Sequence, residues 1–291
     1  MNENNNISDE ERPEHRDFFS KVAVPFAKSK EEVWDSLSEK LAEEDCVQPK
    51  GKLITMVWTK VAAAVVIVFV TSTAFMRLYT TTIVSEKGMH TTHILPDGSI
   101  AELNAASEIA YHPYWWKLNR QVSLEGEAFF EVKKGSSFKV SSKFGNTEVL
   151  GTSFNIYARN KEYKVFCQTG KVAVSNKSSS VNLIISPGDM AILDNKTSTG
   201  VIRYGASANI IAWRLNEFNF NQEPLAKVLQ ELSIQYNVNI ELDNNNLNNL
   251  VYSGRFKKKE SVELTLTLIC QTFNLKFIPK GKHRYTISRN K

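Results

Sequence analysis

The sequence predicts a single-pass membrane protein with a short helical arm before the span, an all-β domain after it and a small α+β domain at the end. Three observations predict this class. One apolar run covers residues 53–78. Beyond it, apolar residues alternate with polar ones on a period of two, and turn-forming residues divide them into short segments. Near the C-terminus, one pattern of apolar residues recurs after thirty-seven residues.

The apolar run carries no charge between positions 61 and 76. A bilayer core about 30 Å thick needs roughly 20 helical residues, so the run spans it if Lys60 extends its ammonium group to the headgroups. A buried core helix is one alternative, but the run is apolar around its whole circumference. A signal peptide cleaved at the small residues 72–74 is another, but about fifty mostly polar residues precede the run. We therefore expect a permanent anchor over residues 53–78.

Flanking charges favour a cytoplasmic N-terminus, because Lys50, Lys52 and Lys60 flank one end of the run and only Arg77 lies close to the other. Residues 1–52 carry thirteen acidic and eight basic side chains, a net charge of −5, and the remainder therefore carries +10. An acidic arm suits a basic partner, such as a protein that itself binds nucleic acid. No basic cluster interleaved with aromatic residues indicates direct nucleic-acid binding.

The arm contains one predicted amphipathic helix. Ser29 is a suitable N-cap, and Glu31 and Glu32 follow in the first turn, where they complement the helix dipole. An apolar stripe follows at helical spacing: Val33, Trp34, Leu37 and Leu41. A fifty-residue arm cannot bury this stripe alone. The membrane surface, a second copy or another protein must cover it, and the acidic polar face disfavours an anionic leaflet, so we expect a protein partner.

The short period-two segments over residues 88–205 predict an all-β domain, arranged as a sandwich, barrel or solenoid. From position 121 to 132 the even positions are core-like, and the odd ones include Glu125, Glu127 and Glu131. These glutamates fit a catalytic or metal cluster, but their alternation with core residues favours a solvated strand face.

An aromatic cluster over residues 111–116, Tyr111-His112-Pro113-Tyr114-Trp115-Trp116, fits either a carbohydrate platform or a loop packed against the sheet. The packed loop is favoured because large rings usually bury.

Residues 213–289 predict a small α+β domain built from a duplicated β-α-β unit. Phe218 and Phe220 mark its first strand, Asn221 is the predicted N-cap of its first helix, and Ser261 is the N-cap of its second.

Motifs for chemistry are absent from the sequence: there is no phosphate-cradling glycine loop, H-E-x-x-H, C-x-x-C or G-x-S-x-G. We therefore expect a binding protein without catalytic residues, cofactor or metal. Cys46, Cys167 and Cys270 are too scattered for a zinc site. The last two share one side of the span and are able to pair, but such sparse cysteine usage favours buried free thiols.

Several short motifs closely resemble the FecR family of anti-sigma factors. They are Leu95-Pro96-Asp97-Gly98-Ser99, Leu103-Asn104, Arg120-Gln121-Val122, Leu124 to Val132, Val149 to Asn155, Gly170-Lys171-Val172 and Pro187-Gly188. The C-terminal repeat is similar to the domain that follows FecR in Bacteroidetes members, itself similar to the short N-terminal domain of secretins and TonB receptors. The arm is shorter than the anti-sigma domain of proteobacterial relatives.

This resemblance implies an inner-membrane protein that holds an extracytoplasmic-function sigma factor in the cytoplasm. It also implies that the periplasmic domains sense the signalling domain of a TonB-dependent outer-membrane transporter. We hypothesise that the sigma-factor contact uses the apolar side chains Phe18, Phe19, Phe26, Trp34 and Leu37, with Glu31, Glu32 and Asp35 setting charge complementarity. The alternative function is an envelope-anchored glycan-binding protein that uses Tyr114, Trp115 and Trp116.

Overall fold

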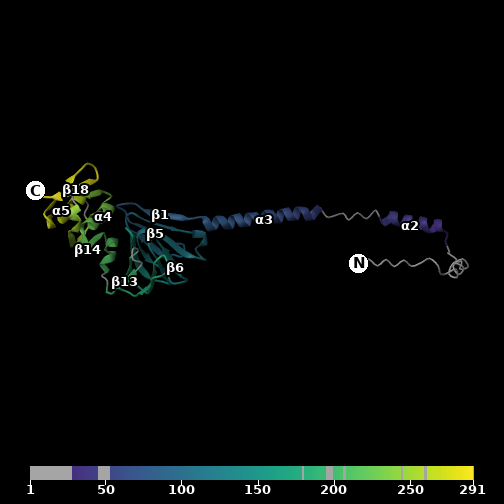
Figure 1. The fold of residues 1–291 in the computed structure, drawn as a ribbon, viewed down its shortest axis with the longest axis horizontal. Helices are drawn as coiled ribbons and strands as arrows, with labels where there is room; N and C mark the ends of the chain where they lie inside the picture. The colour runs from purple at the N-terminus through teal and green to yellow at the C-terminus, as the bar shows by residue number, and fades with distance from the viewer. Residues whose placement is uncertain are drawn as a thin grey trace, which may run out of the picture. The chain divides into compact units, whose positions relative to one another are not determined.

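The computed structural model describes residues 28–44, 53–178, 180–194, 199–205, 208–243, 245–258 and 261–290. The chain forms two units, residues 1–66 and residues 67–291. Figure 1 colours the chain from purple at the N-terminus, through the teal strands of an all-β domain, to the green and yellow C-terminal domain.

Helix α2 (Lys30–Glu44) begins where the sequence predicts it. The Ser29 hydroxyl accepts a hydrogen bond from the Glu32 amide at 3.2 Å, and the Glu32 carboxylate accepts one from the Ser29 amide at 3.1 Å. This reciprocal pair is a capping box, which satisfies two donors that the first turn would otherwise leave open.

Helix α3 (Leu53–Leu78) is the one helix of the described chain that is long and apolar enough to cross a membrane. Its segment Val57–Leu78 has a mean hydropathy of 2.1, and none of it is buried against protein. Thr71 and Thr73 donate their hydroxyls to carbonyls of the preceding turn, at 2.8 and 2.6 Å, so neither donor is left open toward hydrocarbon. A core helix would be buried, so that alternative is wrong, and α3 fits a single-pass span.

The β domain, residues 81–205, begins with strand β1, which lies before the predicted start at residue 88. Its elements are β1 (Thr81–Ser85), β2 (Thr91–Ile94), β3 (Ile100–Leu103), β4 (Ser107–Tyr111), the short helix η1 (Pro113–Trp115), β5 (Arg120–Glu131), β6 (Phe138–Ser141), β7 (Asn146–Val149), β8 (Ser153–Arg159), β9 (Glu162–Thr169), β10 (Val172–Ser175), β11 (Asn182–Ile185), β12 (Met190–Asp194) and β13 (Thr199–Arg203). The all-β class predicted for this region is confirmed.

Two sheets share the long strand β5. The first has the order β1-β4-β5-β6-β7-β10-β11 and the second β2-β3-β5-β8-β9-β12-β13. Only β5 and β6 pair in parallel among these neighbours. Both sheets contribute side chains to one hydrophobic core, for example Val140 and Val174 from the first and Ile156 and Val165 from the second.

Strand β5 passes from one sheet to the other at Gly126. Residues 122–125 pair with β4, and residues 126–131 pair with β8. Gly126 has a φ of +104°, and a Cβ there would lie 2.5 Å from the Ser107 hydroxyl oxygen. Both the backbone conformation and the close approach of Ser107 require glycine.

The C-terminal domain, residues 217–289, contains the strand-helix-strand order twice. Its elements are β14 (Glu217–Pro224), α4 (Leu225–Tyr236), β15 (Asn239–Leu242), the short helix η3 (Asn245–Asn249), β16 (Val251–Lys257), α5 (Val262–Thr272), β17 (Leu275–Pro279) and β18 (Arg284–Arg289). Strands β14 and β16 pair antiparallel, and a second sheet has the order β15-β18-β17. Asn237 follows the last residue of α4, and Asn274 lies two residues after the end of α5. Both have a φ of +53°, a left-handed conformation that asparagine tolerates.

The two predicted helix caps of this domain have different outcomes. The Ser261 hydroxyl accepts from the Glu263 amide at 3.2 Å, as predicted for an N-cap. Asn221 is not an N-cap: it lies within β14, whose pairing with β16 continues past a bulge to Pro224, and α4 begins only at Leu225. The strand is longer than the sequence suggested because its ladder with a distant strand carries it up to the helix.

Candidate functional site

Helix α2 carries five of the predicted sigma-factor contacts and leaves its apolar stripe open. Trp34 is 73% exposed, and Val33, Leu37 and Leu41 are also exposed. At 100° per residue this stripe covers one face of the helix, and Glu31, Glu32 and Asp35 project from the other side. Phe18, Phe19 and Phe26 lie outside the described residues.

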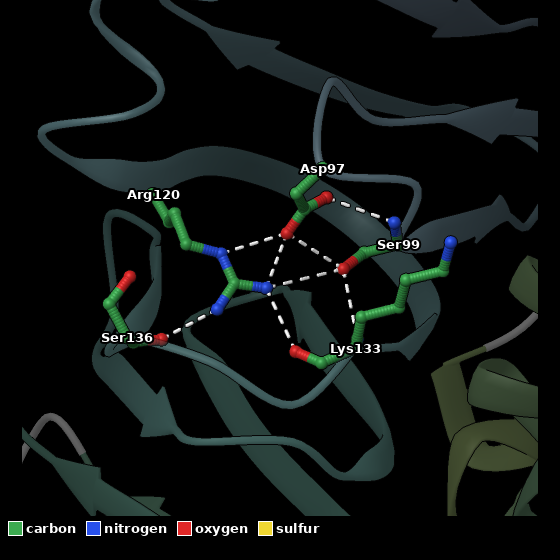
Figure 2. A network of polar contacts seen from close by, with 5 residues as sticks. All are labelled: Asp97, Ser99, Arg120, Lys133 and Ser136. Atoms are coloured by element: carbon green, nitrogen blue, oxygen red, sulfur yellow. Dashed lines mark hydrogen bonds and ion pairs between the residues drawn. The ribbon is translucent and has the colours of Figure 1, made fainter.

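A first network of polar side chains joins three separate segments of the β domain (Figure 2). The guanidinium of Arg120, at the start of β5, donates to Asp97 in the β2–β3 turn through Nε at 2.8 Å and also through Nη2. Its remaining donors reach the carbonyl oxygens of Ser136, at 2.6 Å, and Lys133, at 3.0 Å. Asp97 also accepts from the Ser99 amide at 2.9 Å. The network fixes the β2–β3 turn and the loop after β5 to one buried cation.

The pKa of Asp97 lies below its usual value. Burial alone would raise this pKa, but the hydrogen bonds from the Ser99 amide and from Arg120 favour the ionised form and outweigh it. Each buried polar side-chain atom of Asp97, Ser99 and Arg120 has a hydrogen-bond partner, and the partners named here all lie within the β domain, so this network is a structural clasp.

A second polar network surrounds Glu127, which is only 6% exposed. Its two carboxylate oxygens accept from the side-chain amides of Asn104, at 2.8 Å, and Asn155, at 2.9 Å. Its backbone amide donates to the Ser107 hydroxyl at 3.0 Å, which also accepts from Arg159 at 2.9 Å. Burial and the nearby carboxylate of Glu231 raise the pKa of Glu127 to about 7, against the opposing effects of Arg159 and the two asparagines.

The predicted solvated face is therefore wrong for Glu127, although Glu125 and Glu131 are exposed as expected. The connecting segment η2 (Ala208–Leu215) covers this part of β5: the Arg214 guanidinium lies 3.8 Å from the centre of the Phe129 ring and forms a 2.5 Å ion pair with Glu102. Phe129, an apolar residue at an odd position, was the sequence signal that this face becomes buried.

The Glu127 network continues into the C-terminal half of the chain. A carboxylate only accepts hydrogen bonds, so both asparagines turn their NH₂ groups toward Glu127 and their oxygens away from it. The Asn104 oxygen accepts from Gln235 of α4 at 2.7 Å, and the Asn155 oxygen accepts from the Trp213 indole at 3.2 Å. Glu127 thereby orients two acceptors, one for Gln235 of the C-terminal domain and one for Trp213 of the segment that connects the two domains.

Further contacts lie along the same boundary between the β domain and the C-terminal domain, which we call the domain seam. The Gly88 amide donates to the Ile234 carbonyl at 2.9 Å. Asn160 and Gln230 exchange two side-chain hydrogen bonds at 3.1 and 3.2 Å. Lys227 forms a 3.1 Å ion pair with Glu162.

His90 and a cleft lined by polar and aromatic side chains also lie at the domain seam. His90 faces Gln235 at 3.2 Å and the Trp213 ring edge-on, and burial lowers its pKa. Beside these contacts a cleft of about 820 Å³ is lined by polar side chains and by rings such as Phe166 and Phe218. The arrangement is suited to holding two domains together, and among the described residues no three His, Cys, Asp or Glu side chains gather as metal ligands would.

The aromatic cluster does not form one exposed face. Trp116 is 3% exposed and packs edge-to-face on Tyr111 and Phe138, at centroid distances of 5.4 and 5.9 Å. Tyr114 lies 5.4 Å from the Tyr79 ring, and Trp115 lies 5.4 Å from the Arg77 guanidinium, both beside the end of α3.

Comparison with known proteins identifies the family. The model of the FecR protein family matches residues 81–173, and that of the FecR C-terminal domain matches residues 217–287. Together they cover more than half of the chain. The chain belongs to the FecR family of anti-sigma factors.

Solved structures agree with this membership of the FecR family. A crystal structure at 1.65 Å of a protein described as a "putative anti-sigma factor" from Parabacteroides distasonis ATCC 8503 matches with a TM-score of 0.66 and 28% identity, over 72% of this chain and 100% of that chain. A 2.50 Å structure with the same description and organism matches with the same score and identity, over 73% and 100%. No curated protein matches the sequence.

In this FecR-family protein five of the seven family-like motifs supply residues to the two polar networks. Asp97, Ser99 and Arg120 belong to the clasp, and Asn104, Glu127 and Asn155 meet at the domain seam. The resemblance singled out these residues in the sequence, but only the fold shows what each of them contacts.

Both described cysteines of the FecR-family protein, Cys167 and Cys270, are free and buried, which confirms the prediction of unpaired thiols. Burial raises the pKa of each thiol to about 11. Because the thiolate is the reactive form, neither is a suitable nucleophile near neutral pH.

Proposed function

We propose that this protein is an inner-membrane signal relay that binds an extracytoplasmic-function sigma factor with its cytoplasmic arm. In the periplasm, its β and C-terminal domains sense the signalling domain of a TonB-dependent outer-membrane transporter. It acts by binding and needs no cofactor. The observation that carries the proposal is the apolar stripe of α2, which precedes the candidate span and has no cover within the described residues.

The arm offers both parts of a protein interface. An exposed tryptophan flanked by leucines is the typical anchor of a helix that docks in an apolar groove. The acidic residues on the other side of α2 suit a basic partner through long-range attraction more than through direct contact. Glu32 is in addition committed to the capping box.

We expect Trp34→Ala to weaken sigma-factor binding by about 30-fold, the effect of removing a central anchor worth roughly 2 kcal/mol. The measurement is co-purification of the full-length chain with each extracytoplasmic-function sigma factor of its host, followed by titration of the one that binds. Glu39→Ala, on the polar side of the same helix, is the matched control and should bind normally. Equal binding by wild type, Trp34→Ala and Leu37→Ala would exclude the stripe as the contact.

The transporter contact is supported by open strand edges in the C-terminal domain. In the order β15-β18-β17 the outer strands β15 and β17 each pair on one side only, and such edges accept an added strand. Adding the isolated signalling domain should slow hydrogen exchange of the β15 or β17 amides. Protection confined to the β domain would contradict this placement.

The glycan-binding alternative has less support. It needs Tyr114, Trp115 and Trp116 as one platform, whereas Trp116 is buried and the other two lie against the end of α3.

A further inference from the structure

The β domain follows the candidate span almost without a linker. Helix α3 ends at Leu78 and β1 begins at Thr81, so only Tyr79 and Thr80 lie between them. The Tyr79 amide still donates to the Phe75 carbonyl at 2.9 Å, which continues the last helical turn. Two residues reach at most about 7 Å. If α3 crosses the bilayer, β1 therefore starts at the level of the lipid headgroups.

A loop from much later in the sequence, residues 112–119, is fastened to this exit point. The His112 Nδ1 lies 3.0 Å from the Tyr79 carbonyl oxygen and 3.2 Å from the Thr80 hydroxyl. The Tyr114 and Trp115 rings contact Tyr79 and Arg77, as described above. The loop is thus held beside the last turn of α3 by hydrogen bonds and by ring contacts.

The same loop is anchored on one side and open on the other. Trp116 is buried in the β-domain core, and this fixes the loop backbone. Leu118 is 74% exposed and Tyr114 is 58% exposed, and Lys117 is exposed between them. In water this exposed apolar surface would be unfavourable. At a membrane surface the combination of tyrosine, tryptophan, leucine and a basic residue is the one that interfacial segments use.

We propose that residues 112–119, together with Tyr79, form a membrane-binding foot that seats the β domain on the phospholipid headgroups where α3 leaves the bilayer. Its partner is a lipid bilayer: the Tyr114 ring and the Leu118 side chain enter the interfacial region, and Lys117 and Arg77 lie at the level of the phosphates. The foot fixes the tilt of the β domain on the membrane, so that a load on the C-terminal domain is transmitted to α3. This foot requires that α3 crosses the membrane, as in the proposed function. It requires neither the sigma factor nor the transporter.

The test places a fluorescent label at position 118 of the full-length chain in vesicles of phosphatidylethanolamine and phosphatidylglycerol. Leu118→Cys supplies the attachment point, in a Cys46→Ser background because Cys167 and Cys270 are buried. A lipid that carries a nitroxide just below its headgroup should quench this label at least about twofold. Leu264→Cys, at an exposed leucine of α5 in the C-terminal domain, is the matched control and should not be quenched.

Two further variants separate the ways in which the proposal can fail. A label at Val65→Cys, within α3, should be quenched by a nitroxide placed deeper in the acyl chain. Quenching at 65 without quenching at 118 overturns the foot and leaves the span intact. Absence of quenching at both positions overturns the membrane placement itself. If the fluorescence of the label at 118 changes on addition of saccharide and is not quenched by the nitroxide lipid, the loop would be assigned to glycan binding. Tyr114→Ser with Lys117→Ser, both at exposed positions, should reduce quenching at 118 if the foot is correct.

Discussion

Arg120→Met is expected to lower the free energy of unfolding of the β domain by about 3–5 kcal/mol, the usual cost of removing one partner from a buried ion pair. The Arg120 and Asp97 side chains are 8% and 16% exposed, so Asp97 would keep a nearly buried charge without its cation. The carbonyl oxygens of Lys133 and Ser136 would each lose a donor as well. Methionine keeps an apolar chain as far as the position of Nε and removes the guanidinium with all its donors, so the loss mainly reports the polar network.

The loss is measured by thermal and urea unfolding of the full-length chain in detergent, with near-ultraviolet circular dichroism as the signal. For a domain of this size it corresponds to a fall of about 10–20 °C in the melting temperature. Lys139→Met is the matched control, because the exposed Lys139 pairs with the exposed Glu148 at 3.6 Å. Such a pair contributes less than about 1 kcal/mol. Similar losses in the two variants would show that the clasp has no special role.

The contribution of the clasp to the free energy of unfolding should also be lost at acidic pH. The pKa of Asp97 is lower in the folded protein than in the unfolded chain, so its stabilising contribution is complete above the unfolded pKa. That contribution is lost as the pH falls through the lower, folded pKa. Arg120→Met should flatten this part of the pH profile, because it removes the cation that favours the ionised carboxylate.

Local patterns predicted those parts of the protein whose structure depends on neighbouring residues. The candidate span, the Ser29 N-cap of α2 and the Ser261 N-cap of α5 follow from apolar content and helix-end chemistry, which act within a few residues.

The errors arose where a distant segment decides the environment. Glu127 alternates with core residues like its exposed neighbour Glu125, and only η2 and α4, about a hundred residues later, cover it. Asn221 has cap chemistry, but pairing with β16 keeps it in a strand. Periodicity describes one strand face, whereas a second domain that docks on this face changes its burial without changing its pattern.

Glu127 should make the folded protein more stable as the pH falls from about 8 to about 5. Its folded pKa of about 7 lies above the value of 4.5 expected for the unfolded chain. Between these values the folded state binds more protons, so the free energy of unfolding decreases as the pH rises. The change amounts to about 3 kcal/mol, since a pKa difference of one corresponds to roughly 1.4 kcal/mol.

Other groups at the seam titrate in the same range, so the prediction concerns a difference between variants. The lowered pKa of His90 acts with the opposite sign: its contribution is complete above its ordinary pKa and is lost as the pH falls. Lys258 also acts on His90 electrostatically, and Glu231 and Arg159 act on Glu127. Unfolding is therefore measured for wild type and Glu127→Gln across the range, and subtraction cancels the groups that both proteins share.

The difference between the two proteins in free energy of unfolding should change with pH as the titration of Glu127 predicts. The profile of Glu127→Gln alone should lack this change. Glu125→Gln, at the exposed glutamate two residues earlier, should keep the wild-type profile. The amide nitrogen of glutamine cannot accept a hydrogen bond, whereas both oxygens of the Glu127 carboxyl keep an acceptor lone pair even when the group is protonated. In Glu127→Gln, Asn104 or Asn155 must therefore turn and withdraw its oxygen from Gln235 or Trp213. The Glu127→Gln seam should therefore open more readily, seen as faster exchange of the Gly88 amide, which bonds to Ile234 across it. A flat difference curve with unchanged exchange at Gly88 would show that Glu127 does not control how the two domains dock.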